Sequence, residues 1–152
     1  MGVIRMIEGQ IRTLDNGDDT STPLLGIRQA TNSTTVTIAN NAALSSNIDT
    51  MGHGPRGIAV ETPSAWTAAN IGFEASQTGG TATTEWAKLY GESGSRVQIT
   101  NIGTASANLY MAPADCWALG TYKYFRLASL NTSTGAAVNQ AAARTLKVKM
   151  LG

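Results

Sequence analysis

The segment PSAWTAANIGFEASQTGGTATTEWAKLY, residues 63–90, decides the fold of this chain. Residues 70–76 alternate apolar side chains with small or polar ones, which puts Ile71, Phe73 and Ala75 on one face. A polar loop with two consecutive glycines follows at 77–84, and a second aromatic segment runs over 85–90. Alternation with a period of two, broken by a glycine-containing turn, is typical of an antiparallel β-sheet.

The same pattern continues along most of the chain. Apolar residues alternate in short segments that are separated by turn residues such as Gly, Pro, Asn and Ser. Turn signals every eight to twelve residues or so predict an all-β fold, and we expect an antiparallel β-sandwich. The expected strands are 35–39, 43–49, 57–62, 70–76, 85–90, 96–100, 108–112, 121–130 and 144–151.

Two segments depart from the strand pattern. AAVNQAAAR, residues 136–144, is predicted to be helical because alanine has the highest helix propensity. We expect at most a turn or two, since so short a helix has little stability of its own. PADCWALG, residues 113–120, is expected to be irregular or to form one helical turn.

Residues 1–33 differ from the rest, and we separate them from a sandwich domain at 34–152. Their apolar residues predict either a strand or one short amphipathic helix. We interpret the segment as an extended N-terminal arm, or as a first strand plus linker, that the domain itself or a neighbouring subunit must cover. The residues expected to contact a partner are Val3, Ile4, Met6, Ile7 and Ile11.

The composition favours a binding surface of short neutral side chains. Hydrophobic residues make up 42% of the 152 residues, which is enough for one domain with a real core. Only 14% are charged, against roughly 25% in an average soluble domain. Thr, Ser, Asn and Gly side chains lose little conformational entropy when a partner immobilises them. Such surfaces are typical of virion and adhesion proteins, and also of secreted β-domains.

The net charge of +1 gives no overall field that would attract nucleic acid or a membrane, so neither is an expected partner. After Asp115 the chain has no acidic residue. Two interpretations of this basic segment stay open. Its lysines lie on the solvent face of an edge strand, where they discourage aggregation, or they contact an acidic partner. The cations are Lys123, Arg126, Arg144, Lys147 and Lys149, of which Lys147 and Lys149 are expected at the partner interface.

Cys116 is the single cysteine, so no disulfide forms within the chain. Its neighbours Trp117 and Leu119 indicate a buried, inert thiol. The opening MGVIRMIEGQIRTL is interrupted by charges and lacks a clear cleavage site, which argues against a signal peptide. No stretch approaches the roughly 20 apolar residues of a membrane-spanning helix. We therefore expect the protein to fold in a cytoplasm.

No histidine or calcium-loop motif forms a complete site. His53, the only histidine, lies in a Gly-rich loop without Cys or carboxylate partners at zinc-ligand spacing, and no GxSxG motif is present. Asp15, Gly17 and Asp19 begin like a calcium loop, but Gly26 stands where that loop needs a bidentate Glu. A loop histidine and an Asn-Gly-Asp-Asp turn are the better interpretations.

The carboxylates are scattered along the chain. Glu74 and Glu92 could face each other across strands, but nothing in the sequence marks them as a general acid–base pair. We therefore predict a protein that is not an enzyme, has no catalytic residue and uses no metal or cofactor.

The three tryptophans allow two interpretations. Sandwich cores often bury Trp, which we expect for Trp66 and Trp86. An exposed Trp could instead stack on a sugar ring, as in carbohydrate-binding modules. The segment TYKYFR, 121–126, interleaves aromatic and basic residues as nucleic-acid-binding surfaces do, but strand alternation would divide it between two faces.

Four stretches resemble small structural proteins of tailed bacteriophages: TVTIANNAALSSNIDT (35–50), GIAVETPSAWTAANIGFEASQ (57–77), LYGESG (89–94) and KYFRLASLNTSTGAAVNQAAARTLKV (123–148). The shared pattern is a Pro-x-x-Trp-Thr segment before a Phe-x-x-Ser strand, then a Tyr-x-Arg strand and a Gln-x-x-x-Arg tail. Here its residues are Pro63, Trp66, Thr67, Phe73, Ser76, Tyr124, Arg126, Gln140 and Arg144.

The similarity covers about residues 34–150. It departs from the pattern after the Ser strand, where an Asp-Gly-Gly turn is usual and this chain has Thr78-Gly79-Gly80 with extra residues following. The resemblance implies a jelly-roll-like sandwich on a virion and, among virion proteins, a head decoration (cement) protein. It also implies the partners: the major capsid protein, and copies of the chain itself as a dimer or trimer. The alternative that stays open is a carbohydrate-binding module of a phage fibre or tail.

Overall fold

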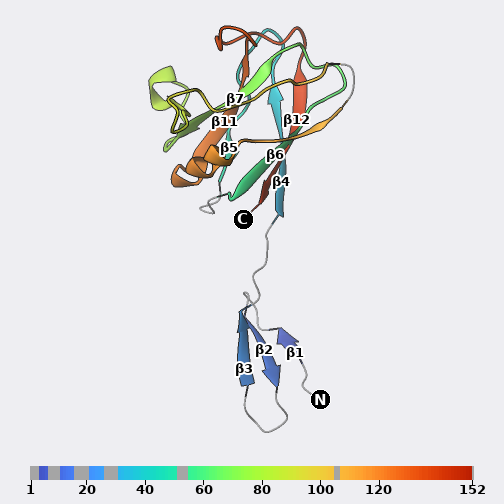
Figure 1. Cartoon of the computed structure of the whole chain (residues 1–152), viewed down its shortest axis with the longest axis vertical. Helices are drawn as coiled ribbons and strands as arrows, with labels where there is room; N and C mark the ends of the chain where they lie inside the picture. The colour runs from blue at the N-terminus through green and yellow to red at the C-terminus, as the bar shows by residue number, and fades with distance from the viewer. Residues whose placement is uncertain are drawn as a thin grey trace. The chain divides into compact units, whose positions relative to one another are not determined.

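The computed structural model describes the backbone of residues 4–6, 11–15, 21–25, 31–50, 55–104 and 107–151, and side chains from residue 32 onward within those ranges. The chain divides into two compact units, Met1–Ala30 and Thr31–Gly152 (Figure 1). The sequence placed the start of the sandwich at residue 34, and its first strand begins at Thr31.

The first unit is a three-stranded antiparallel meander. Its strands are β1 (Ile4–Met6), β2 (Ile11–Asp15) and β3 (Ser21–Leu25), in the order β1-β2-β3. Of the two alternatives that the sequence left open for this region, strand and amphipathic helix, the described residues form strands. They form three paired strands where a single first strand was expected.

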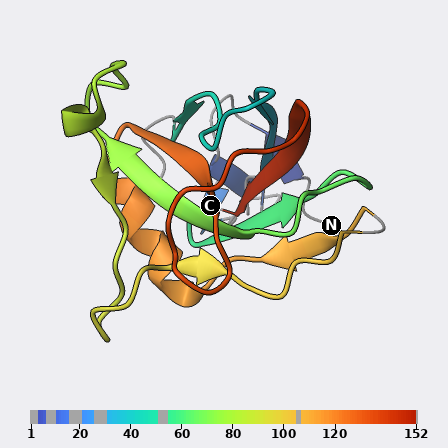
Figure 2. The ribbon, with the colours of Figure 1, turned by 90° about the horizontal axis from the view of Figure 1, so that it is seen from above.

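The second unit contains two antiparallel sheets (Figures 1 and 2). Sheet 1 has the order β10-β6-β12-β4, and sheet 2 the order β5-β11-β7-β8 with β9 also paired to β7. The bounds are β4 Thr31–Ile38, β5 Ile48–Asp49, β6 Gly57–Glu61, β7 Asn70–Ser76, β8 Ala87–Lys88, β9 Gln98–Ile99, β10 Leu109–Met111, β11 Tyr124–Leu130 and β12 Arg144–Leu151. Two 3₁₀ helices, η1 (Thr83–Glu85) and η2 (Ala114–Thr121), complete the described elements. The predicted all-β antiparallel sandwich is confirmed.

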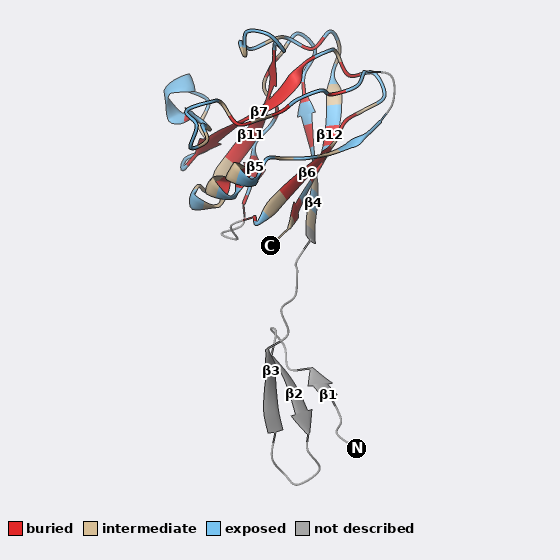
Figure 3. Ribbon diagram, viewed as in Figure 1, coloured by how far each residue is buried: buried red, intermediate tan, exposed pale blue. Residues whose placement is uncertain are grey.

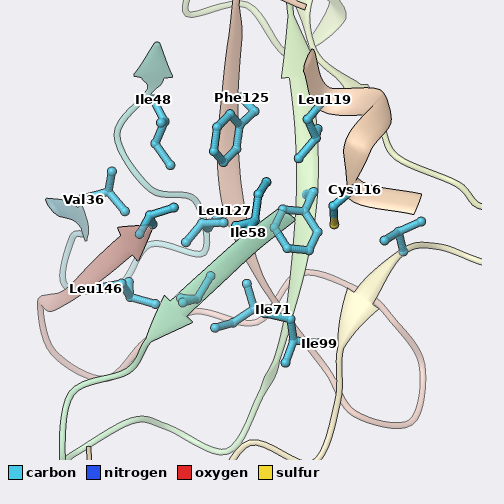
Figure 4. Close-up of a cluster of buried hydrophobic side chains, with 14 of the residues drawn as sticks. Val36, Ile48, Ile58, Ile71, Ile99, Cys116, Leu119, Phe125, Leu127 and Leu146 are labelled. Atoms are coloured by element: carbon cyan, nitrogen blue, oxygen red, sulfur yellow. The ribbon is translucent and has the colours of Figure 1, made fainter. Parts of the chain in front are cut away.

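The core lies between the two sheets. In β12, Leu146, Val148 and Met150 are buried while Lys147 and Lys149 are exposed, as the alternation predicted. Each fully buried aliphatic or aromatic side chain contributes about 1.5–3 kcal/mol, so the interdigitated inner faces supply most of the stability. The largest of these side chains, shown in part in Figure 4, are Trp66, Phe73, Phe125, Ile38, Ile48, Ile58, Ile71, Leu119, Leu127 and Leu146.

Strand β7 is buried on both faces, so its alternation in sequence is not an alternation in exposure (Figure 3). Ile71, Phe73 and Ala75 face the core. On the other face, a Cβ atom at Gly72 would lie 2.5 Å from Leu130 Cδ1 and 3.3 Å from Arg96 Nε. Leu130 of β11 and Arg96 therefore both pack against this face, and the closer of the two contacts, with Leu130, requires the neighbouring side chain to shift if residue 72 is not glycine.

Two sequence-based predictions about local structure are wrong. Residues 136–144 form no helix, because their backbone pairs with other segments: Gln140 N donates to Ala42 O (2.9 Å) and Asn41 N donates to Gln140 O (3.0 Å). Strand β12 is not an edge strand, since β6 and β4 flank it. The segment 113–120 was expected to be irregular or to form one helical turn; Pro113 caps the 3₁₀ helix η2, and the residues after it lie in that helix, which has eight residues.

Candidate interaction surfaces

The outer face of sheet 1 carries the two lysines that the sequence assigned to a partner interface. Lys147 lies opposite Glu61 of β6, and its Nζ is 2.7 Å from Glu61 Oε1. The hydrogen bond and charge of Lys147 lower the pKa of the Glu61 carboxyl. Lys149 lies opposite Ser33 and Ala59 and is exposed. One of the two positive charges is thus neutralised within the sheet.

Two other cations of the C-terminal segment, Lys123 and Arg126, do not extend this surface. Arg126 is buried in sheet 2, and Lys123 lies over the Tyr124 ring at 5.1 Å. Tyr124 and Phe125 face opposite sides of β11, so the segment 121–126 is divided between two faces, as predicted. The basic segment of the sequence is therefore not a single basic patch.

Beside Glu61 and Ala59 the same face becomes apolar. Leu109 lies opposite Glu61 and Met111 opposite Ala59, and the two side chains are 53% and 60% exposed. They belong to β10, which forms an edge of sheet 1. Neither residue was among the candidate interface residues predicted from the sequence. Its available signal was the run Leu-Tyr-Met, three apolar residues in succession, which cannot all face one core.

The register of the first unit separates the residues predicted at the partner interface. Ile4 pairs with Leu14, and Met6 with Arg12, so all four lie on one face of the meander together with Leu24. Ile11 pairs with Leu25 and lies on the other face of the meander. Val3 and Ile7 lie outside the described residues. We call the first set the apolar face of the meander: Ile4, Met6, Leu14 and Leu24, with Arg12 and Thr22.

The three tryptophans have different environments. Trp66 is 2% exposed and donates from Nε1 to Ala69 O (2.9 Å), and Trp86 is 7% exposed and donates to Gly80 O (2.8 Å). Both are buried as predicted. Trp117, on η2, is 61% exposed.

A second exposed aromatic side chain, Tyr90, is 56% exposed and precedes the turn that begins at Gly91. A Cβ atom at Gly91 would lie 2.5 Å from Asp115 Oδ2, so this turn packs against the start of η2. An exposed tyrosine, an exposed tryptophan on η2 and a partly exposed carboxylate therefore belong to adjoining segments of the sandwich.

A buried charge cluster holds the outer face of sheet 2. Glu74 Oε2 accepts hydrogen bonds from Arg126 Nε (3.0 Å) and Nη2 (2.8 Å), and Glu74 Oε1 accepts from Arg96 Nη2 (3.0 Å). The Arg126 guanidinium lies 4.1 Å from the centre of the Trp86 ring. In the sheet, Glu74 lies opposite Arg126 and Lys88, so its neighbours across the strands are cations and not a second carboxylate such as Glu92. A carboxylate held by two guanidiniums is a structural ion pair.

The Cys116 thiol is free and 1% exposed, which confirms the buried cysteine. Burial, and to a lesser extent the negative charge of Asp115, raises its pKa from 9.0 to about 12. The folded chain therefore keeps this proton at pH values where the unfolded chain has released it, and unfolding releases a proton.

This shift predicts that stability falls as the pH rises from about 9 towards 12, because the unfolded state then binds fewer protons than the folded state. Urea titrations at stepwise increasing pH will measure the slope. Cys116→Ala removes the group, so its free energy of unfolding should fall less steeply with pH than that of the unchanged chain. Equal slopes in the two proteins would contradict the assignment.

Within the described residues, no three His, Cys, Asp or Glu side chains gather as metal ligands would. His53, Gly17, Asp19 and Gly26 lie outside these residues, and Asp15 ends strand β2. No described helix is long and apolar enough to cross a membrane.

Comparisons of the chain with protein-family models, curated proteins and solved structures found no significant match.

Proposed function

We propose that this protein is a structural protein of a tailed-phage virion that binds the outer surface of the head and ties neighbouring coat subunits together. In this proposal it acts without catalysis, metal or cofactor. The observation that carries the proposal is the meander of residues 4–25, a sheet of one layer with an apolar face, joined to a sandwich that has its own core. The assignment to a phage virion rests on the sequence resemblance to small structural proteins of tailed bacteriophages.

A three-stranded sheet of this size cannot bury its apolar face by itself, and isolated small sheets need a further layer for stability. The apolar face carries Ile4, Met6, Leu14 and Leu24 on one side of the sheet. In the proposal a groove between coat subunits provides the second layer. Ser and Thr side chains of the sandwich then add contacts of low entropic cost, and many copies around the shell sum by multivalency.

The proposal predicts that Leu14→Asp lowers binding to undecorated phage heads by roughly tenfold or more, because a carboxylate would lie in the middle of the docked face. Thr13→Asp is the matched control, since the neighbouring residue lies on the opposite face of the same central strand. Cosedimentation of purified protein with heads over a concentration series measures both. Equal binding by the two variants would remove the apolar face from the interaction, and failure of the unchanged protein to sediment with heads would reject the function.

A carbohydrate-binding module of a fibre or tail is the second candidate, and the exposure of Trp117 and Tyr90 favours it. Exposed aromatic rings can stack on sugar rings, and a nearby carboxylate such as Asp115 can accept hydrogen bonds from the sugar hydroxyl groups. A glycan array separates the two candidates. If the protein is a carbohydrate-binding module, it should bind a glycan on the array, Trp117→Ala should abolish that binding, and Leu14→Asp should leave it unchanged. No binding to any glycan would reject this candidate.

A further inference from the structure

Strand β10 has one edge that no strand of the described residues covers. It is the light-orange strand near the bottom of Figure 2 and forms the end of sheet 1, with β6 as its only neighbour. Such an edge presents unpaired backbone groups and can accept another strand. Proteins usually protect these edges with lysine, proline or a bulge. Here the exposed residues of the strand are Leu109 and Met111.

The hydrogen bonds to β6 determine which backbone groups point to the free edge. Thr62 N donates to Asn108 O (2.9 Å), and Ala112 N donates to Ile58 O (2.8 Å). In an antiparallel pair, successive residues alternate between facing the partner strand and facing away. The peptide groups of Leu109 and Met111 therefore face away from β6, and together they offer two N–H donors and two C=O acceptors.

This edge is complementary to itself. We propose that two copies of the protein pair through β10, antiparallel and across a two-fold axis at Tyr110, to join their sheets into one continuous sheet. In this register Leu109 of one copy lies opposite Met111 of the other, so both pairs exchange two hydrogen bonds. The four outward N–H groups and four outward C=O groups of the two copies then form four hydrogen bonds, and the closed two-fold contact ends at a dimer.

The side chains fit the same register. Leu109 and Met111 lie on the outer face of sheet 1, so each Leu109 packs beside the partner's Met111 on that face. The nearest charges on this face are Glu61, one strand away from the junction within each copy, and Lys147 and Lys149, two strands away. No like charges meet across it.

The opposite edge of sheet 1, strand β4, differs from β10 in its side chains and in its free backbone groups. β4 presents Ser33, Thr35 and Thr37, and Ser46 N donates to Thr37 O (3.1 Å), which closes part of that edge. Polar side chains and a partly closed edge make β4 a poor surface for self-pairing, and this is why the proposal assigns the contact to β10. The contact is short, so we expect a weak dimer with a dissociation constant on the order of 0.1 mM.

Sedimentation velocity over a concentration series tests the association. Met111→Lys places a charge at the junction and is expected to raise the dissociation constant by roughly tenfold or more. Thr37→Lys adds the same charge at the other edge and should leave it unchanged. A monomer at every concentration up to about five times the expected constant, or equal weakening by both variants, overturns the proposal. The far-UV circular dichroism of both variants confirms that they are folded.

Disulfide trapping tests the register independently. Residues 109 and 111 face each other across the axis, within bridging range, whereas 109 and its own copy lie diagonally, about 7–8 Å apart. An equimolar mixture of Leu109→Cys and Met111→Cys proteins in a glutathione redox buffer should therefore give a crosslinked heterodimer. Each variant alone should stay uncrosslinked, and the buried Cys116 contributes no background. No crosslink in the mixture, or equal crosslinking by Leu109→Cys alone, overturns the pairing.

Discussion

Replacing Glu74 by glutamine should lower the free energy of unfolding by about 3–5 kcal/mol, because it removes the one carboxylate from a buried cluster that also holds two guanidiniums. The side chains of Glu74, Arg96 and Arg126 are only 9–13% exposed. Glutamine has nearly the same shape, so the loss reports the charge. Two uncompensated cations would then face each other beside the Trp86 ring.

The prediction can be tested by ranking three variants by their loss in free energy of unfolding. Arg96→Met leaves the Glu74–Arg126 pair neutral, so it should cost less than Glu74→Gln although it removes a larger polar group. Glu61→Gln is the exposed control, since it breaks the ion pair with Lys147 where solvent screens the charges, and little change is expected. Urea denaturation followed by tryptophan fluorescence gives all three values. A Glu74→Gln protein as stable as Glu61→Gln would show that the cluster is not a structural element.

The second large effect is expected at Gln140, which is 0% exposed. Its Nε2 donates to Ser129 Oγ (2.8 Å), and its Oε1 accepts from Thr67 N (3.1 Å). The side chain thereby ties segment 136–144 to β11 and to the turn after Pro63. Gln140→Ala leaves both partners unsatisfied in or near the core, at about 1–3 kcal/mol each, so we expect a total loss of about 2–6 kcal/mol.

The sign of this effect distinguishes the structure from the helix that the sequence predicts for 136–144. Alanine is the better helix former, so Gln140→Ala would stabilise a helical segment, whereas it destabilises the observed loop. Asn139→Ala, at the exposed neighbour, serves as control and should stay within about 0.5 kcal/mol. A stabilised Gln140→Ala protein would contradict the loop. Hydrogen exchange should also become faster in residues 138–142 of the Gln140→Ala variant.

The strands that were well predicted are those in which inward apolar residues alternate along the sequence with small or polar ones. β12 was placed with the correct bounds and the correct inward residues, because Leu146, Val148 and Met150 alternate with lysines. β7 also matches its predicted range, 70–76. The inward residues Val36 and Ile38 of β4 and Ile58 and Val60 of β6 follow from the same rule.

Alternation along the sequence did not predict the surroundings of residues on the face of a strand that points away from the core. The burial of Glu74 depends on a loop that brings Arg96 over sheet 2, and the exposure of Leu109 depends on β10 being at an edge. Both are consequences of long-range placement. For the same reason Ile4 and Ile11, grouped together from the sequence, lie on opposite faces of the meander: register decides the face, and pairing decides the register.

The sequence by itself determined the all-β class, most strand positions and the inner faces of the sandwich, because periodicity of two is a local property that hydrophobic burial enforces residue by residue. The tertiary structure alone decided which strands are edges, which charges are buried together and which apolar side chains stay in solvent. Those features depend on contacts between residues far apart in the chain, such as Glu74 with Arg126 and Gln140 with Thr67, whose energies outweigh local propensity.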